Sequence, residues 1–219
     1  MHYKVLLILF KMTEQKEHLQ ALSDIRSMME RSSRCISLSG LSGVFAGIFA
    51  LIGAYAAYLK MQVFNMDLYS RSATINVSEV FAYLFCDAGL ILIVSLLVGT
   101  LLTIRNSKRK GIKTWDNSAK RLLINLSIPL ITGGLFCLVL LYHGIIGLVA
   151  PATLIFYGLA LINASKYTFN DIRYLGMCEI ALGIVASIYI GYGLFFWAFG
   201  FGVLHIIYGA VMYFKYERE

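Results

Sequence analysis

The sequence predicts an all-α membrane protein that crosses the bilayer six times. Of its 219 residues, 59% are hydrophobic and only 14% are charged, which is too few charges to cover the surface of a soluble domain. Six apolar segments each have roughly the 20 residues that a helix needs to cross the hydrocarbon core of a bilayer. Together these segments contain only two formal charges, Asp87 and Glu179.

The six apolar segments divide the chain into regions. The six predicted spans are residues 37–59, 80–104, 122–142, 145–165, 174–192 and 194–214. Ahead of them, residues 13–35 place apolar side chains at helical spacing, which predicts an amphipathic helix on the cytoplasmic face. We expect residues 1–11 to be a start-site extension, because the helical pattern begins directly after a second methionine, Met12. Residues 215–219 are predicted to be a cytoplasmic tail.

The distribution of positive charge predicts the orientation. With six spans, 17 of the 19 lysine and arginine residues fall on one side of the membrane, and by the positive-inside rule this side is the cytoplasm. Both termini are therefore predicted to be cytoplasmic. The most basic loop, residues 105–121, is expected to contact anionic lipids. Its contact residues are Arg105, Lys108, Arg109, Lys110 and Lys113. No aromatic-interleaved basic motif accompanies this charge, so no nucleic-acid partner is predicted.

One face of the first predicted span consists of small residues. Their spacing alternates between three and four, which places them along a single helix face. They are Gly40, Gly43, Gly47, Ala50, Ala54 and Ala57. Such a face lets two helix backbones approach closely. We expect it to be a packing seam within the chain, and the alternative is a homodimer interface.

Five polar residues inside the spans are candidates for a functional site. Glu179 and His205 both lie on small-residue faces of neighbouring helices, so we expect them to meet in the bundle interior. Asn125 and Asn163 are predicted to lie together nearer the cytoplasm, and Asp87 is predicted to stand apart from both pairs. An ionisable residue within the membrane indicates function by default, although a structural hydrogen bond is the competing interpretation.

The sequence does not contain the complete motif of any of the enzyme classes considered, so no enzymatic activity is predicted. The segment Gly40–Gly43 contains the Gly-x-Ser-Gly pattern of rhomboid intramembrane proteases, but its serine lies in the first span instead of a later one. The four cysteines lack metal-ligand spacing. His143 and His205 are predicted at different depths, which excludes paired haem ligation. No metal or cofactor is expected.

An inverted repeat of three helices plus three is also predicted. Residues 37–142 would form one half and residues 145–214 the other, as in many transporter folds. The two acids inside the spans, Asp87 and Glu179, fall at equivalent positions of this alignment, and each directly follows a cysteine.

Two stretches of the sequence resemble a known family. The segment that begins EHLQALSDIRSMMERSSR and the terminal segment WAFGFGVLHIIYGAVMYFKYE are similar to a family of uncharacterised six-helix bacterial membrane proteins. The resemblance covers most of the chain from Met12 onward. It implies a location in the bacterial inner membrane, and it implies no activity.

The sequence leaves two functions open. The first is a transporter or channel-like protein for a small ion or solute, with Glu179 and His205 as its polar site and Asn125 and Asn163 at the cytoplasmic mouth. The second is a non-catalytic scaffold or regulatory subunit that binds a cytoplasmic protein through the amphipathic helix and the basic loop. Transport requires access to Glu179, whereas a scaffold needs only a dry core.

Overall fold

A computed structural model describes residues 39–70, 77–109, 111, 115 and 117–218, together with residues 15, 18–20 and 22. The chain divides into two units, Met1–Arg34 and Cys35–Glu219. In the first unit, the few described residues are helical. The predicted start-site extension and most of the predicted amphipathic helix lie outside the described residues.

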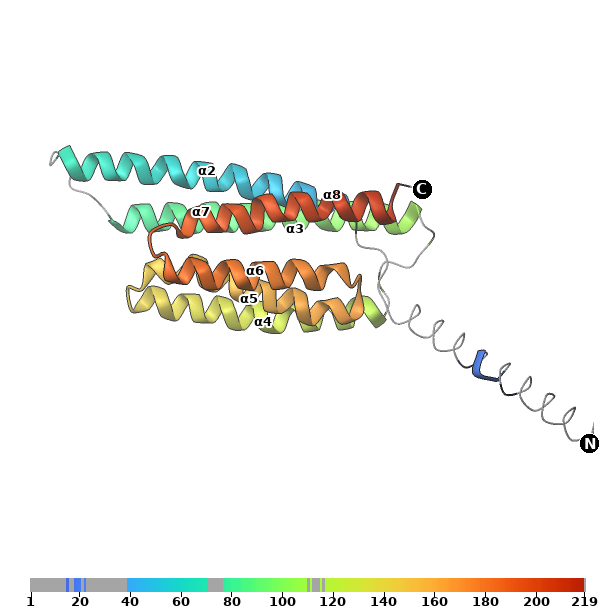
Figure 1. The fold of residues 1–219 in the computed structure, drawn as a ribbon. Coiled ribbons are helices and arrows are strands. Elements are labelled where there is room, and N and C mark those ends of the chain that lie inside the picture. Colours follow the sequence, from blue (N-terminus) through green and yellow to red (C-terminus); the bar gives the residue numbers. More distant parts are fainter. Residues whose placement is uncertain are drawn as a thin grey trace, which may run out of the picture. The chain divides into compact units, whose positions relative to one another are not determined.

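The second unit is built entirely from helices in its described part (Figure 1). Its long helices are α2 (Gly40–Ser70), α3 (Val77–Arg109), α4 (Asn117–Tyr142), α5 (Val149–Ala164), α6 (Asp171–Ile188) and α8 (His205–Tyr216). Between α6 and α8 lie a short helix and a π-helical segment, α7 (Gly193–Trp197) and η3 (Ala198–Leu204). Two 3-10 turns, η1 (Ile146–Leu148) and η2 (Ser165–Tyr167), flank α5.

Five helices are long and apolar enough to cross a membrane, so the multi-pass prediction is confirmed at that level. They cover residues Gly40–Gln62, Ala82–Arg109, Asn117–Tyr142, Ile146–Tyr167 and Gly193–Tyr216. The sixth predicted span, residues 174–192, corresponds to α6. This helix has 18 residues and carries Asp171, Arg173 and Glu179, so it is not among those five.

The first two membrane helices extend beyond their predicted ends. Helix α2 has 31 residues and α3 has 33; at 1.5 Å per residue each is longer than the hydrocarbon core is thick. Hydropathy marks where a helix leaves the apolar region, not where its hydrogen bonding stops. The last turn of α3 therefore carries Lys108 and Arg109, and these two and Arg105 are exposed there. Lys110 and Lys113 lie outside the described residues.

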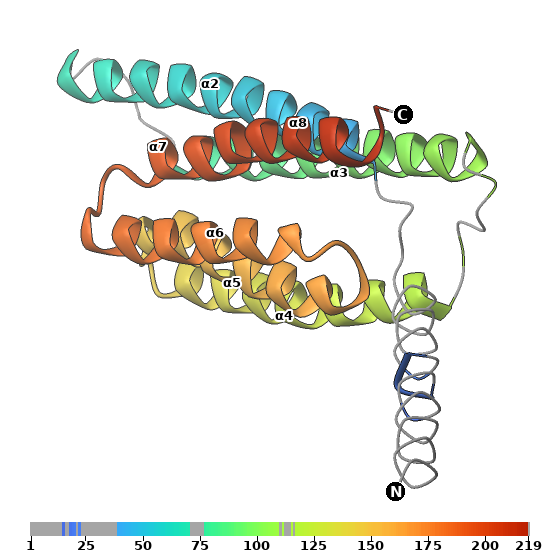
Figure 2. The ribbon, with the colours of Figure 1, turned by 45° about the vertical axis from the view of Figure 1, so that its right-hand side comes forward.

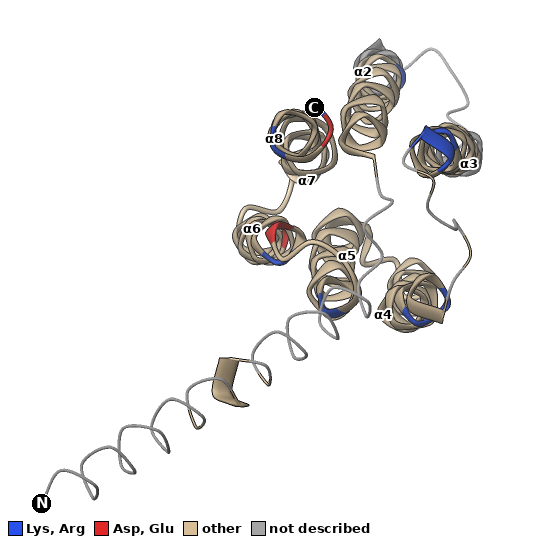
Figure 3. Ribbon diagram, turned by 90° about the vertical axis from the view of Figure 1, so that its right-hand side faces the viewer, with Lys and Arg blue, Asp and Glu red and all other residues tan. Residues whose placement is uncertain are grey.

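The helices pack as two groups. Helix α2 packs against both α3 and η3–α8, and α5 packs against both α4 and α6. Figure 2 shows α2, α3 and α8 above α4, α5 and α6. The view along the helices shows α2, α3 and α8 together, with α4, α5 and α6 forming the other group (Figure 3). The last helix thus joins the first two. The groups do not coincide with residues 37–142 and 145–214, and the inverted repeat stays a prediction.

Glycines bring α2 and η3–α8 into backbone contact. A Cβ atom added to Gly43 would lie 3.2 Å from the Cα of Gly209, and one added to Gly47 would lie 2.6 Å from the carbonyl oxygen of Gly202. Ala50, Ala54 and Ala57 of the predicted seam are also buried. The seam therefore packs within the chain, against the two glycines of η3–α8.

A second glycine contact joins α5 to α6. A Cβ on Gly158 would lie 2.5 Å from the carbonyl oxygen of Gly176, and a Cβ on Gly176 would lie 2.7 Å from that of Gly158. Two helical turns further along α6, a Cβ on Gly183 would lie 2.9 Å from the carbonyl oxygen of Pro151. Because neither helix presents a side chain at these points, the backbones lie against each other.

The C-terminal end of α8 and the residue that follows it hold the N-terminal ends of two other helices. The Glu217 carboxylate accepts hydrogen bonds from the backbone N–H of Gly40 and from the Ser39 hydroxyl, the latter at 3.1 Å. It thereby caps the N-terminus of α2. In the first turn of α6, Asp171 Oδ2 accepts from Lys215 Nζ at 2.7 Å and from the Tyr216 hydroxyl at 2.9 Å.

The α2–α8 seam predicts a steric effect at Gly209. Changing Gly209 to Ala places a methyl group about 2.5 Å from the Val44 nitrogen and 2.7 Å from the Gly40 carbonyl oxygen, so the helices must separate. We expect unfolding in detergent to show a loss of about 1–3 kcal/mol. Gly134 has no heavy atom near the corresponding position. The matched control Gly134→Ala should leave stability unchanged or slightly raised, and equal losses would contradict the seam.

The Asp171 contacts predict a pH dependence of stability. The hydrogen bond from Lys215, and also that from Tyr216, lowers the pKa of Asp171 below its ordinary value. A depressed pKa in the folded state gives stability that is present above the unfolded pKa of ~3.9 and is lost as the pH falls through the folded pKa. Asp171→Asn should therefore lower the melting temperature at pH 7. The difference from wild type should shrink as melting curves are recorded at pH values that fall below ~3.9 and through the folded-state pKa.

Candidate functional site

Glu179 and His205 meet in the interior, where α6 faces the start of α8. The Glu179 side chain has no exposed surface, and His205 is 6% exposed. His205 Nδ1 lies 3.4 Å from Glu179 Oε1. Each residue comes from a face of small residues, with Gly176 and Gly183 beside Glu179 and Gly202 and Gly209 beside His205, all of them buried or nearly so. The predicted pairing of Glu179 with His205 is present.

Two hydrogen bonds fix the His205 ring. Nδ1 lies 2.9 Å from the carbonyl oxygen of Gly200, and Nε2 lies 2.8 Å from the Tyr157 hydroxyl. A carbonyl oxygen can only accept, so Nδ1 carries a hydrogen in this arrangement. In the neutral ring Nε2 is then an acceptor, and it receives the hydrogen of the Tyr157 hydroxyl. The ring thus connects α5 with the π-helical segment.

The π-helical segment makes room for the Glu179 carboxyl group. A Cβ atom on Gly200 would lie 2.5 Å from Glu179 Oε2 and 2.6 Å from a methyl carbon of Leu154. Gly200 also supplies the carbonyl that binds His205. Segments of π-helix are rare, and they occur frequently at functional sites. The predicted span 194–214 is continuous, and within it the π-helical segment leaves the Gly200 carbonyl free for the His205 side chain.

The Glu179 carboxyl group has no hydrogen-bond partner among the described residues. Both of its oxygen atoms are buried. The Tyr208 hydroxyl is also buried and has no hydrogen-bond partner among the described residues. An isolated charge in such surroundings is strongly unfavourable. Two arrangements keep the pair neutral overall: a protonated Glu179 with a neutral His205, or a carboxylate with an imidazolium. Both hold the same number of protons.

Apolar and aromatic side chains enclose the pair. Leu154 is fully buried against it. The ring of Phe201 is stacked on His205 at 5.8 Å and is tilted against Tyr157 at 4.9 Å. These groups offer no hydrogen bond to the carboxyl oxygens. The centre is therefore closed to solvent in this conformation.

Asp87 lies apart from this centre. Its Oδ2 atom would be 3.4 Å from a Cβ on Gly53, and the side chain of its neighbour Ile91 fills the rest of that space. Asp87 thus faces α2 in the α2–α3 contact, and it is partly buried whereas Glu179 is fully buried. The two acids that the predicted repeat aligns occupy different surroundings.

The Asn163 side chain contacts the helix of Asn125 for a local reason. The Asn163 side-chain amide donates to the backbone carbonyl of Asn125 at 2.8 Å. In a regular helix that carbonyl would accept from residue 129, but Pro129 has no N–H. The Asn125 side chain donates to the carbonyl of Arg121. Asn163 therefore satisfies a carbonyl that a proline leaves free, which favours a structural role.

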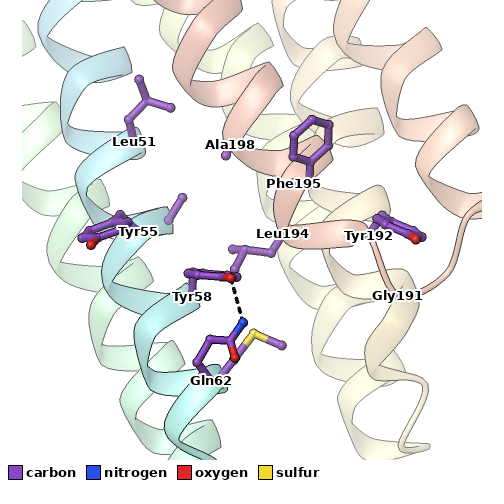
Figure 4. Close-up of a pocket in the computed structure, with 11 residues that line it drawn as sticks. Leu51, Tyr55, Tyr58, Gln62, Gly191, Tyr192, Leu194, Phe195 and Ala198 are labelled. Atoms are coloured by element: carbon purple, nitrogen blue, oxygen red, sulfur yellow. Dashed lines mark hydrogen bonds between the residues drawn. The ribbon is translucent and has the colours of Figure 1, made fainter. Parts of the chain in front are cut away.

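A cavity of about 450 Å³ lies between α2 and α7, at the opposite end of α6 from Asp171 (Figure 4). It is lined by Leu51, Ala54, Tyr55, Tyr58, Met61, Gln62, Gly191, Tyr192, Leu194, Phe195 and Ala198. Gln62 donates to the Tyr58 hydroxyl at 2.7 Å. The cavity does not include Glu179, although Ala198 begins the π-helical segment and the Leu51 side chain lies against Gly202.

Two members of the centre, Tyr157 and Gly200, were missed by the sequence analysis. Tyr157 resembles any aromatic residue of an apolar helix, and nothing in the sequence places its hydroxyl beside His205. The signal for Gly200 in the sequence is the Gly-x-Gly pair, Gly200 and Gly202, that shortly precedes His205.

The role of Asn163 predicts a dependence on Pro129. Asn163→Ala should lower stability by about 1 kcal/mol in the wild-type background, because it leaves the Asn125 carbonyl unpaired. In a Pro129→Ala background the restored N–H can bind that carbonyl, so the same substitution should cost clearly less. Unfolding curves of the four proteins measure the coupling. Additive losses would contradict this role for Asn163.

The chemistry of the centre follows from its own atoms. Carboxyl, carbonyl and hydroxyl oxygens point into it together with one imidazole, so it suits a proton or a cation. Among the described residues, no group of three His, Cys, Asp or Glu side chains could hold a metal ion. Comparison of the sequence with family models, curated proteins and solved structures found no match.

Proposed function

We propose that the chain is a six-span membrane transporter or channel-like protein that moves a small cation through the Glu179–His205 centre. The observation that carries the proposal is the buried Glu179 carboxyl group, both of whose oxygens lack a hydrogen-bond partner among the described residues. Placing an ionisable group there is costly, and such groups within membranes mark ion pathways and proton relays.

The proposal includes α6 as the sixth span. Its charged residues Asp171 and Arg173 lie in the first turn, where they can reach the membrane surface. Only Glu179 then remains at depth. With six spans both termini share one side, and the excess of lysine and arginine on that side makes it the cytoplasm. In a bacterial cell this membrane would be the inner membrane.

The position of the centre supports transport. Glu179 and Tyr157 belong to the α4–α6 group, while His205 and Gly200 belong to the η3–α8 side of the other group. Substrate sites of secondary transporters lie at such an interface, where one group of helices moves against the other. The cavity between α2 and α7 reaches Ala198, two residues before Gly200. It offers an approach from the outer side.

The donor and acceptor atoms favour a cation over an anion. Glu179 and the Gly200 carbonyl contribute oxygen acceptors, and no lysine or arginine contacts the pair among the described residues. An anion would meet a carboxyl group and a carbonyl dipole of the same sign. A cation would replace the proton that keeps the pair neutral.

Ion fluxes in proteoliposomes test the proposal. The purified protein should dissipate a gradient of at least one of H⁺, Na⁺ and K⁺, each tested separately with a dye selective for that ion. Glu179→Gln should reduce this flux by about tenfold or more, because the amide cannot exchange a proton or bind a cation as a carboxylate does.

Asp87→Asn is the matched control. It makes the same carboxyl-to-amide change in another membrane helix, at the α2–α3 contact, and it should leave the flux near the wild-type value. Equal loss in both variants would remove the special role of Glu179. Absence of any flux in the wild type, with the protein folded, would instead favour the scaffold function.

A further inference from the structure

We infer that the transported cation is the proton, and that it travels between Glu179 and the Asp171 end of the bundle through His205, Tyr157 and Tyr208. This inference rests on the proposed function, and it adds the identity of the ion and the residues of one half of its path. Tyr208 is the new element, because neither the site nor its packing otherwise explains its hydroxyl group.

The space around Glu179 selects the smallest cation. The Oε2 atom is so near Gly200 that even one added carbon would lie 2.5 Å from it, and Leu154 closes the same place. The cavity between α2 and α7 stops short of the carboxyl group. A sodium or potassium ion needs several oxygen ligands around it, and here such an ion would have to displace packed side chains. A proton needs only a lone pair.

The next polar atoms along α8 continue the path. His205 Nε2 is bonded to the Tyr157 hydroxyl. Tyr208 lies three residues after His205, so it is on the same helix face about 4.5 Å nearer the end of α8. Tyr157 and Tyr208 both pack against the buried cluster of Leu161, Ile172 and Leu175.

The Tyr208 hydroxyl is buried without a partner among the described residues. A buried hydroxyl without a partner is unfavourable, and a structural tyrosine could be replaced by phenylalanine at no cost. The group is explained if water molecules bridge it to the Tyr157 hydroxyl on one side and to the surface on the other.

The path ends at a partly exposed acid. Asp171 opens α6, and it is held by Lys215 and Tyr216 at the end of α8. Because both helices run from the centre to this point, Tyr208 lies between His205 and the Asp171 group along α8. The hydrogen bond from Lys215 keeps the pKa of the Asp171 carboxyl below its ordinary value, so Asp171 stays ionised and marks the surface end of the path.

The proton balance is complete at each step. A proton arriving from water is accepted by the Tyr208 oxygen as its own hydrogen passes to the Tyr157 oxygen, and the Tyr157 hydrogen passes to His205 Nε2. The ring is then doubly protonated. Its Nδ1 hydrogen, which was bonded to Gly200, passes to the Glu179 carboxylate at Oε1, and a neutral ring with its hydrogen on Nε2 remains. The centre resets when Glu179 returns its proton to Nδ1 and the Nε2 hydrogen passes to the Tyr157 oxygen, while the Tyr157 hydrogen passes back to Tyr208 and the Tyr208 hydrogen returns to water. The path therefore loads and unloads the carboxyl group reversibly.

The test removes only the hydroxyl group. Proton uptake into proteoliposomes is driven by a potassium diffusion potential and followed with an internal pH dye. Tyr208→Phe should slow uptake by about tenfold, and Tyr208→His should restore part of it because imidazole can relay a proton. Tyr213→Phe is the matched control on the same helix, and it should keep the wild-type rate. Melting temperatures of all variants should agree with the wild type.

The outcomes separate this inference from the proposed function. Flux of Na⁺ or K⁺ without H⁺, abolished by Glu179→Gln, would overturn the proton as substrate and leave the proposed function standing. Proton flux that depends on Glu179 and is unchanged in Tyr208→Phe would overturn the path. Absence of every flux would overturn both. Selective loss in Tyr208→Phe, with rescue by His, supports the path.

Discussion

The fully buried carboxyl group of Glu179 is the constraint on which the remaining structure depends. A group of this kind is tolerated only where a neighbour can exchange a proton with it, and His205 is that neighbour. The ring must in turn be oriented, which requires the Tyr157 hydroxyl and the Gly200 carbonyl. The Gly200 carbonyl is free to turn toward the ring because the helix is locally π-helical. The buried acid on α6 thus constrains how α5, the π-helical segment and α8 are arranged around it.

Glycine contacts position these helices without a hydrophobic driving force. Lipid is as apolar as the helix surfaces, so association depends on close packing. The Gly158–Gly176 contact fixes α5 on α6 and thereby places Tyr157 opposite Glu179, while Gly43 and Gly209 fix α2 on α8. The two groups meet through fewer contacts, along α7 and η3. Rigid contacts within each group and sparse contacts between them place the polar centre where relative motion is easiest.

The sequence predicted most of the helices and the central pair, but not what surrounds that pair. The separation of charged from apolar stretches, together with the length of each apolar stretch, locates membrane helices because a charge inside the bilayer is energetically costly. The Glu179–His205 pair was predictable because both residues interrupt small-residue faces on adjacent helices. The Tyr157 contact was not, because it depends on the rotation of α5 about its axis, which Gly158 determines and which an apolar sequence does not reveal. The hydrogen bond from Asn163 to the Asn125 carbonyl was not predictable either, because the acceptor that Pro129 leaves free on another helix is visible only once the two helices are side by side.

The cap that Glu217 places on α2 has a consequence for assembly of the protein in the membrane. The first amide groups of α2 are synthesised long before residue 217, so they lack this partner while the intervening helices insert. The α2 N-terminus and the first turn of α6 acquire their bonds in one event, when α8 reaches its place beside α2. Docking of α8 therefore completes the hydrogen bonds at two helix ends that lie far apart in the sequence.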